Sequence, residues 1–291
     1  MEHKKILILG GNRFVGKLLA EKLLNHHHVT LFNRKGTGPG NCKIIKGDRN
    51  NIEDLKKLNF HEYDCIVDMC LYLPSQFKLM EPLLNKKVNY IFISSGAAYK
   101  DVDTFPIYEN NELGGLKAFE DYGKEKADVE NLLKNSNLEN YKILRPTYIV
   151  GVENPKLRLG YYISSLQNNS IIHVEGDGNN LISLVFGEDV VECILKFIFS
   201  EDINSHSPIP YNICNDECLT VNSFIKIIAK ELGIEEYRIQ LNSSKSSHPA
   251  IFPYTHYGVF SNKNMKNYYN QNFKSLKESL PEYIEWFKLN S

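Results

Sequence analysis

The segment ILILGGNRFVG, residues 6 to 16, decides the fold of this chain. Its aliphatic residues 6 to 9 predict a buried strand, and Gly10 and Gly11 predict a tight turn directly after it. Apolar residues at helical spacing follow up to Leu24 and predict a helix. This order brings the N–H groups and the positive dipole end of a helix against the end of a strand, which is a place for a pyrophosphate.

Two glycines of this turn stand where a dinucleotide site needs residues without side chains. Gly10 serves the turn itself, and Gly16 permits close packing of the helix on the strand. Arg13 takes the middle position of the G-x-x-G-x-x-G spacing. Such a turn can also merely connect a strand to a helix. Its location after the first strand and before a second aliphatic run favours the nucleotide-binding interpretation.

The composition is that of an ordinary soluble globular protein. The chain has 291 residues, of which 42% are hydrophobic and 24% charged, and it carries 34 basic against 35 acidic side chains. Nucleic acid is an unlikely partner in this interpretation, because phosphate binding requires an excess of positive charge. No apolar run approaches eighteen residues and no signal peptide is recognisable, so we expect no membrane contact and a cytoplasmic location.

The sequence predicts no metal site. Its six cysteines form no C-x-x-C pair, and we interpret them as reduced core thiols. Three adjacent histidines, residues 26 to 28, cannot all face one ion from the end of a helix. A solvated helix terminus, where histidine complements the negative end of the dipole, explains them better.

Strands and helices alternate along the first half of the chain. Strands are expected at residues 6–9, 28–32, 42–46, 64–68, 88–93 and 141–144, with helices or short connections between them. This alternation predicts an α/β fold: a Rossmann-type, doubly wound parallel sheet with right-handed crossovers and helices on both faces. We assign residues 1–150 to an NAD(P)-binding core. Residues 151–291 form a small carboxyl-terminal substrate lobe, interleaved with the core, that adds strands and a cap over the site.

The end of the second strand bears on the choice of cofactor. An acidic residue there would bind the ribose 2′-hydroxyl of NAD, whereas an arginine accommodates the 2′-phosphate of NADP. The chain has Arg34 and Lys35 at this position and no acid, with Arg13 on the nearby turn. This cationic cluster predicts a preference for NADP over NAD. The alternative is that Arg34 and Lys35 are ordinary exposed charges.

Three polar residues in the middle of the chain suit acid/base catalysis. Tyr122 and Lys126 are four apart on an expected helix, so they share one face. A phenol with a pKa of about 10 is a poor acid/base at neutral pH, and a nearby ammonium favours its ionised form. Ser95 ends a central strand, where ligands gather in open α/β sheets. The alternative is a tyrosine that packs along a lysine stem.

These motifs together resemble the extended short-chain dehydrogenases/reductases, and among them the NAD-dependent epimerase/dehydratase family. The resemblance rests on GGNRFVG, GDR at 47–49, SSGAAY at 94–99, YGKEK at 122–126 and LRPTYIVG at 144–151. It extends loosely through VFGEDV at 185–190. It implies a Rossmann core that binds NAD(P), a catalytic Ser95, Tyr122 and Lys126, and a lobe for a sugar or nucleotide-sugar substrate.

The resemblance also implies positions along the cofactor. Asp48 and Arg49 would lie at the adenine, Met69 and Cys70 along the dinucleotide, and residues 146 to 148 near the nicotinamide, while Lys126 would hold the nicotinamide ribose. The whole predicted cofactor-binding set is Gly10, Asn12, Arg13, Phe14, Val15, Gly16, Asn33, Arg34, Asp48, Arg49, Met69, Cys70, Ser94, Pro146 and Thr147.

Two departures from the family pattern narrow the functional hypothesis. Arg13 is similar to a variant found in atypical extended members, some of them RNA-associated proteins of chloroplasts. Sugar-nucleotide dehydratases carry an Asp-Glu pair after the catalytic serine or threonine, whereas this chain has Gly96 and Ala97, which disfavours dehydration. The main hypothesis is an epimerase or carbonyl reductase acting on a sugar-like substrate. The alternative is a non-catalytic dinucleotide-binding or RNA-associated protein, and a homodimer is left open.

Overall fold

The computed structural model describes residues 3–154, 158–199, 210–243, 251–253 and 258–290. The chain divides into two compact units. Unit 1 contains residues 1–101, 109–146 and 190–213, and unit 2 contains residues 102–108, 147–189 and 214–291. In the described residues no helix is both long enough and apolar enough to cross a membrane.

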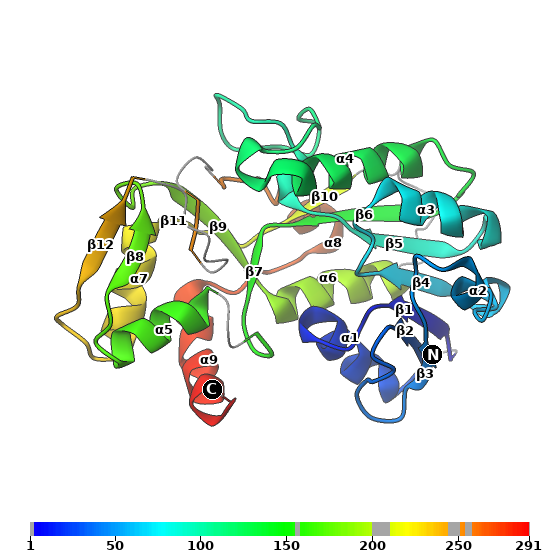
Figure 1. The fold of residues 1–291 in the computed structure, drawn as a ribbon, viewed down its shortest axis with the longest axis horizontal. Helices are drawn as coiled ribbons and strands as arrows, with labels where there is room; N and C mark the ends of the chain where they lie inside the picture. The colour runs from blue at the N-terminus through cyan, green and yellow to red at the C-terminus, as the bar shows by residue number, and fades with distance from the viewer. Residues whose placement is uncertain (1–2, 155–157, 200–209, 244–250, 254–257, 291) are drawn as a thin grey trace. The chain divides into compact units, whose positions relative to one another are not determined.

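Unit 1 is built on a parallel sheet of seven strands (Figure 1). Its strands are β1 (Lys5–Leu9), β2 (His28–Asn33), β3 (Lys43–Lys46), β4 (Cys65–Asp68), β5 (Asn89–Ile93), β6 (Tyr141–Pro146) and β10 (Pro210–Ile213). They are ordered β10-β6-β5-β4-β1-β2-β3, and every neighbouring pair is parallel. This is the doubly wound order, in which the direction of winding reverses between β1 and β4. The predicted fold class is confirmed.

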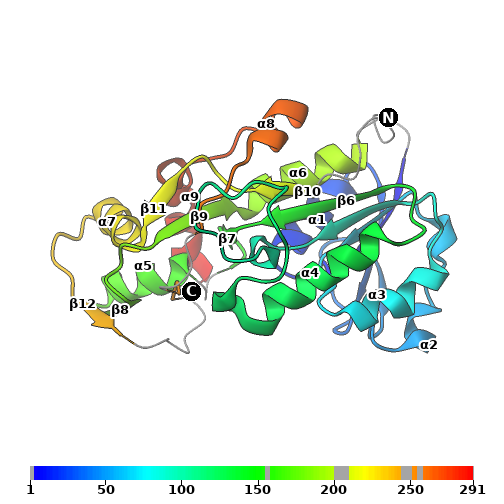
Figure 2. The same cartoon turned by 90° about the horizontal axis from the view of Figure 1, so that it is seen from above.

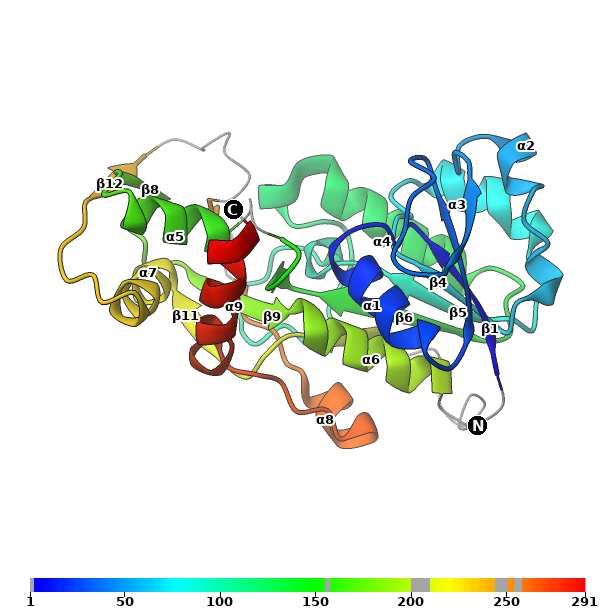
Figure 3. The same cartoon turned by 90° about the horizontal axis from the view of Figure 1, so that it is seen from below.

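Helices cover both faces of this sheet. The helices of unit 1 are α1 (Phe14–Leu24), α2 (Ile52–Leu55), α3 (Pro74–Met80), α4 (Glu120–Lys134) and residues 190–199 of α6 (Gly187–Phe199). Short 3₁₀ turns are η1 (Phe60–Glu62), η2 (Glu81–Leu83), η3 (Gly96–Ala98) and η4 (Lys117–Phe119). Helices α3 and α4 lie over one face (Figure 2), and α1 and α6 lie over the other (Figure 3).

The glycine turn has the geometry that the sequence predicts. Gly10 and Gly11 have φ values of 101° and 79°, which side-chain-bearing residues rarely adopt. A Cβ on Gly16 would lie 2.6 Å from the Cα of Gly11, so α1 can pack this closely only with glycine there. The positive φ angles of the turn and the close approach of the helix therefore both require glycine.

Unit 2 contains two small sheets and four complete helices in its described residues. Strands β7 (Tyr148–Val150), β9 (Leu181–Phe186) and β11 (Cys218–Thr220) form one sheet, and β8 (Ile172–Glu175) pairs with β12 (Ile239–Asn242) in the other. The helices are α5 (Leu159–Gln167), α7 (Val221–Glu231), α8 (Lys263–Tyr269) and α9 (Leu276–Asn290). An aromatic cluster of Tyr148, Tyr162, Phe224 and Phe252 fills its interior.

The cysteines are free, as expected, but they do not all lie in the core. Cys65, Cys193 and Cys214 are buried, whereas Cys42 and Cys70 are half-buried and Cys218 is exposed. Cys42 lies just before β3, and Cys218 is the first residue of β11. Both strands are at the edge of their sheets, where a side chain has a neighbouring strand on one side only. In the part of the chain that the structure describes, no three histidine, cysteine, aspartate or glutamate side chains are grouped to hold a metal ion.

Candidate active site

The glycine turn meets the loop that follows β4. Strands β1 and β4 are paired with Leu9 opposite Asp68, so the residues after them leave the sheet at one level. A Cβ on Gly10 would lie 3.4 Å from Met69 Cβ and 3.6 Å from Cys70 Sγ. The structure therefore brings together Gly10, Met69 and Cys70 at the point where the winding of the sheet reverses, which is the ligand-binding position of such folds.

The other residues of the turn differ in how much they can offer a ligand. Arg13 is exposed, and Asn12 and Phe14 are half-buried. Val15 and Gly16 are buried, so they can contact a ligand only through their backbone. The N-cap of α1 is Arg13, whose side chain does not cap the helix, so the first N–H groups of α1 have no side-chain cap.

Asn33 and Arg34 have different roles at the end of β2. The Asn33 side chain accepts a hydrogen bond from Gly36 N at 2.9 Å and donates to Thr37 O at 2.9 Å. Its amide therefore organises the glycine loop, and its buried position leaves it little surface for a ligand. Arg34 is exposed and close enough to Tyr72 to act on it electrostatically.

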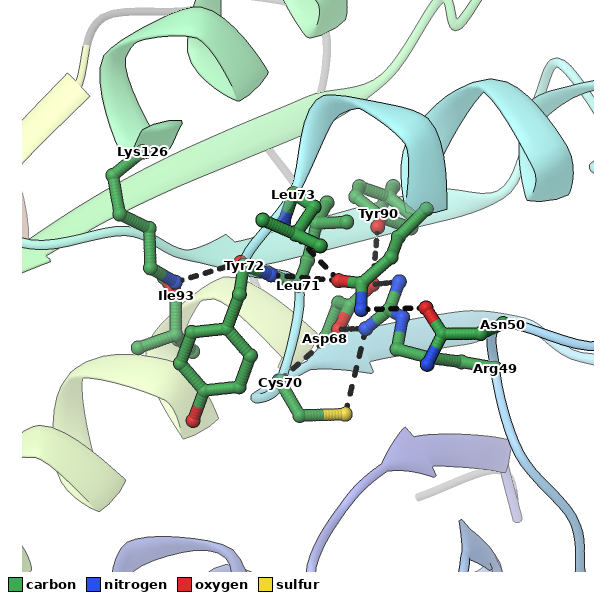
Figure 4. Close-up of polar contacts among 11 residues, drawn as sticks. Arg49, Asn50, Asp68, Cys70, Leu71, Tyr72, Leu73, Tyr90, Ile93 and Lys126 are labelled. Atoms are coloured by element: carbon green, nitrogen blue, oxygen red, sulfur yellow. Dashed lines mark hydrogen bonds and ion pairs between the residues drawn. The ribbon is translucent and has the colours of Figure 1, made fainter. Parts of the chain in front are cut away.

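Arg49 is a member of a buried ion pair. Its two Nη atoms donate to the two carboxylate oxygens of Asp68 at 2.7 and 2.9 Å, and the exposed fractions of these side chains are 8% and 0% (Figure 4). The Asp68 charge raises the pKa of Arg49 against the effect of burial. Arg49 was predicted to lie at the adenine; because both of its Nη atoms are bound to Asp68, these two atoms have few donors left for a ligand. Asp48 accepts hydrogen bonds from Asn50 N and Nδ2.

Asp68 is the centre of this buried network. Besides Arg49, it accepts a hydrogen bond from the Tyr90 hydroxyl at 2.7 Å and one from Cys70 N at 3.2 Å. Gln76 adds a second set of contacts: it accepts from Tyr72 N and Leu73 N and donates to Asn50 Oδ1. The loop between β4 and α3 is therefore fixed to β4, to α3 and to the loop after β3.

Ser95 and Tyr122 are brought together by close packing of α4. The Ser95 side chain accepts from Ala97 N at 3.1 Å and caps η3. A Cβ on Gly123 would lie 2.3 Å from the carbonyl oxygen of Ala97, so α4 approaches η3 as closely as glycine permits. This approach brings Tyr122 beside Ser95, whose side chain lies close enough to act on the pKa of the Tyr122 hydroxyl.

The pKa of Tyr122 does not follow the sequence prediction. Burial of the hydroxyl raises this pKa, and the hydrogen bond with Ser95 offsets only part of the effect. The residue as a whole nevertheless remains 38% exposed. The predicted lowering by Lys126 is not found, because the ammonium lies 6.0 Å from the Tyr122 ring centroid and is turned toward other acceptors.

Lys126 points into the sheet from α4. It is 2% exposed, and its Nζ donates to Leu71 O at 2.8 Å and to Ile93 O at 2.9 Å (Figure 4). Burial lowers the pKa of Lys126 to about 8, although the charges of Asp68 and Glu130 act in the opposite direction. Two of its three N–H donors are used in this way, which leaves one for a ligand.

Ser94 belongs to a second buried network rather than to an open site. Its hydroxyl donates to Glu130 Oε1 at 2.6 Å, and only 3% of the residue is exposed. Arg145 donates to both oxygens of Glu130, at 2.9 and 2.6 Å, and to the Tyr99 hydroxyl at 2.6 Å. The predicted cofactor contact of Ser94 is therefore not available to its side chain.

The remaining predicted cofactor residues lie at the end of β6. Pro146 is buried and is the last residue of unit 1 in this stretch, while Thr147 is half-buried and begins a segment of unit 2. Strand β6 runs through Arg145 and Pro146, two residues beyond its expected end. Pairing of Pro146 with Ile213 of β10 explains the extension.

Sequence reasoning missed Tyr72 and the residues that hold it. Tyr72 is 47% exposed, its ring centroid lies 6.4 Å from that of Tyr122, and Lys126 Nζ lies 4.9 Å from it. Its position in the sequence could have indicated this role. Tyr72 comes four residues after Asp68, in a loop at the carboxyl end of a central strand, and Ser95 lies at the carboxyl end of the neighbouring parallel strand.

Comparison with known proteins agrees with this fold. A sequence model of the NAD dependent epimerase/dehydratase family matches residues 73–214. The chain is 27% identical over 254 residues to the chloroplast stem-loop binding protein of 41 kDa b of Arabidopsis thaliana, a match that spans 81% of this chain and 65% of the plant protein. It is 27% identical over 154 residues to UDP-glucose 4-epimerase of Corynebacterium glutamicum, spanning 40% of this chain and 45% of the enzyme.

Solved structures share the fold at low sequence identity. The UDP-glucose 4-epimerase of Thermotoga maritima, crystallised with UDP-glucose, superposes with a TM-score of 0.81 at 18% identity and covers 98% of this chain and 99% of its own. The family match includes Tyr122, Lys126 and Arg145. Residues 73–214 of this chain are therefore similar to the NAD dependent epimerase/dehydratase family, and the chain as a whole shares the fold of solved nucleotide-sugar epimerases.

Proposed function

We propose that this protein is an NAD(P)-dependent epimerase acting on a sugar or nucleotide-sugar substrate, with simple carbonyl reduction as the related alternative. The observation that carries the proposal is the close approach of α4 to η3, which places Tyr122 beside Ser95 at the carboxyl end of the sheet, with Lys126 on the same helix face. The family match and the epimerases among the similar proteins support it.

The residues at the turn fit a dinucleotide. A phosphate can approach the backbone at Gly10 and the uncapped N–H groups of α1, and Arg13 and Arg34 are exposed cations on the same edge. When bound, the nicotinamide supplies the acceptor and donor of hydride. The remaining donor of Lys126 would hold the nicotinamide ribose, as it does in the family.

The chain's own residues then move the proton. Ser95 would hold the substrate oxygen by a hydrogen bond, and Tyr122 would take the proton of that oxygen as hydride leaves the carbon. Returning the same proton from Tyr122 restores the hydroxyl group. Because burial raises the pKa of Tyr122, the resting phenol is protonated at neutral pH, and it can accept a proton only when positive charge nearby favours its anion.

The proposal is tested by incubating the purified protein with NAD or NADP and UDP-glucose, UDP-N-acetylglucosamine or the corresponding galactose compounds. We expect a C4 epimer to form, detected by proton NMR of the anomeric signal, with no net consumption of cofactor. Net oxidation of NADPH by a sugar ketone would instead support the reductase. Absence of both, in protein that binds the dinucleotide, would contradict an enzymatic role on these substrates.

We further propose that NADP binds more tightly than NAD. The end of β2 offers Arg34 and no acid to the adenosine ribose, which suits a 2′-phosphate. Replacing Arg34 by alanine should weaken NADP binding about tenfold and leave NAD binding within about twofold, since charged hydrogen bonds contribute about 1.5–3 kcal/mol. Calorimetric titration measures both. Lys43→Ala, an exposed cation at the amino end of β3 and so away from the end of β2, is the matched control; equal loss for both cofactors would contradict the assignment.

The name of the plant relative favours a second candidate function, an RNA-associated protein without catalysis. The chain covers 65% of that protein, and its net charge of −1 gives no general attraction to phosphate. Salt-dependent retention of a stem-loop RNA at submicromolar protein would support this candidate. The oligomeric state, proposed as a homodimer, is open to measurement by sedimentation.

A further inference from the structure

The ammonium of Lys126 lies between two aromatic rings. Its Nζ is 4.9 Å from the centroid of Tyr72 and 4.9 Å from that of Phe92, and 6.0 Å from that of Tyr122. A cation within about 6 Å of a ring centroid is attracted by the negative face of the ring, and more strongly where water is excluded. Lys126 is 2% exposed, so the attraction acts in a desolvated place.

The charged groups around Lys126 do not by themselves balance its burial. The carboxylates of Asp68 and Glu130 and the thiol of Cys70 favour the cation, whereas the guanidinium of Arg49 opposes it. Asp68 and Glu130 are each bound to an arginine, so their charges are largely neutralised within their own pairs. Burial therefore prevails and lowers the pKa of Lys126 to about 8.

The loop that carries Tyr72 is fixed on both sides of this residue. Gln76 Oε1 accepts from Tyr72 N at 2.9 Å and from Leu73 N at 3.1 Å. Leu71 O accepts from Lys126 itself, and Cys70 N donates to Asp68. The backbone that carries the Tyr72 ring is thus held in place beside Lys126, in the loop after β4 (Figure 4). The residue is nevertheless 47% exposed.

We propose that Tyr72 is a positioning residue that, with Phe92, keeps the ammonium of Lys126 charged and in place beside Tyr122. Its importance for turnover rests on the proposed function, whereas its effect on Lys126 does not. Phe92 is buried in the core and cannot be removed without a cavity. Tyr72 is partly exposed, so a substitution there leaves no buried cavity, and it is the residue to test.

The test is the titration of Lys126 in Tyr72→Leu and Tyr72→Phe, followed by the ¹³Cε and ¹⁵Nζ NMR signals of labelled lysine and assigned with Lys126→Met. Leucine keeps much of the volume but has no ring, so the pKa of Lys126 should fall by about one pH unit. Phenylalanine keeps the ring, so the pKa should stay near that of the unchanged protein. Tyr108→Leu, at a tyrosine of similar exposure in unit 2, should not change it.

The direction of the shift separates this proposal from simple shielding. If Tyr72 only excluded water, its removal would hydrate Lys126 and raise the pKa; a rise or no change in Tyr72→Leu would overturn the proposal. A fall of equal size in Tyr72→Phe would also overturn it, because the ring would then not be the cause. Thermal melting checks that each variant is folded.

A second measurement connects Tyr72 to turnover. If charged Lys126 is required, activity should decline as the pH rises through the pKa of Lys126, and Tyr72→Leu should move that decline about one pH unit lower. Tyr72→Phe should keep the profile of the unchanged protein. Absence of activity in every form would count against the proposed function, while the NMR titration would still decide the role of Tyr72.

Discussion

Tyr122→Phe is expected to reduce turnover by about a hundred- to ten-thousandfold, the usual contribution of a positioned general acid/base. The change removes one hydroxyl and keeps the ring, which packs beside Tyr72. The hydroxyl is the group on which the Ser95 side chain acts, and 38% of Tyr122 is exposed to solvent. The measurement is the initial rate of epimer formation at saturating substrate and cofactor.

Binding of the dinucleotide serves as the internal control for this variant. Tyr122 lies on α4 rather than in the glycine turn, so the dissociation constant of NAD or NADP should stay within about threefold, less than the tenfold that 1.4 kcal/mol would produce. Ser95→Ala should lose less activity than Tyr122→Phe, because Ser95 orients a proton transfer that Tyr122 performs. Full activity of Tyr122→Phe would contradict the catalytic assignment.

The second large effect is expected at Arg145. This guanidinium, 1% exposed, is bound to both oxygens of Glu130, which is fully buried. Arg145→Met leaves the buried Glu130 charge with only the partly exposed Lys134, 4.0 Å away, so the free energy of unfolding should fall by about 3–5 kcal/mol. Equilibrium unfolding in urea measures the change, and the midpoint of thermal unfolding should drop with it.

The double variant Glu130→Leu with Arg145→Met tests the cause. If the cost comes from an uncompensated buried charge, removing both partners should recover most of the lost stability, because buried pairs can often be replaced by apolar residues of similar volume. Lys22→Met breaks an exposed ion pair with Glu192 and should cost less than about 1 kcal/mol. A double variant as unstable as Arg145→Met would point to lost packing instead.

The core sheet and its first turn could be predicted because their signals are local. Period-two and period-3.6 patterns of apolar residues fix strands and helices, and the alternation of the two leaves few topologies. Elements with weak patterns escaped: β7 and β11 have three residues each, and α8 has seven. Helix α2 is likewise short, with four residues after the Asn51 cap.

The sequence by itself also determined the spacing of Tyr122 and Lys126 on one helix face, since four residues complete about one helical turn. The contact of Tyr122 with Ser95 was decided by tertiary structure, through the close approach that Gly123 permits. The direction of the Tyr122 pKa was decided there too, because burial outweighs a lysine whose donors face backbone carbonyls.

Tertiary structure also decided which polar and charged side chains of unit 1 are engaged in the interior. Arg49 and Ser94 follow strands and were expected to face a cofactor, yet Asp68 and Glu130 engage them in the interior. Which buried charges meet depends on contacts between residues 15 to 36 positions apart, and no local pattern encodes them. The chain's local patterns thus determined the fold and the type of site, while long-range packing decided which polar side chains remain free for chemistry.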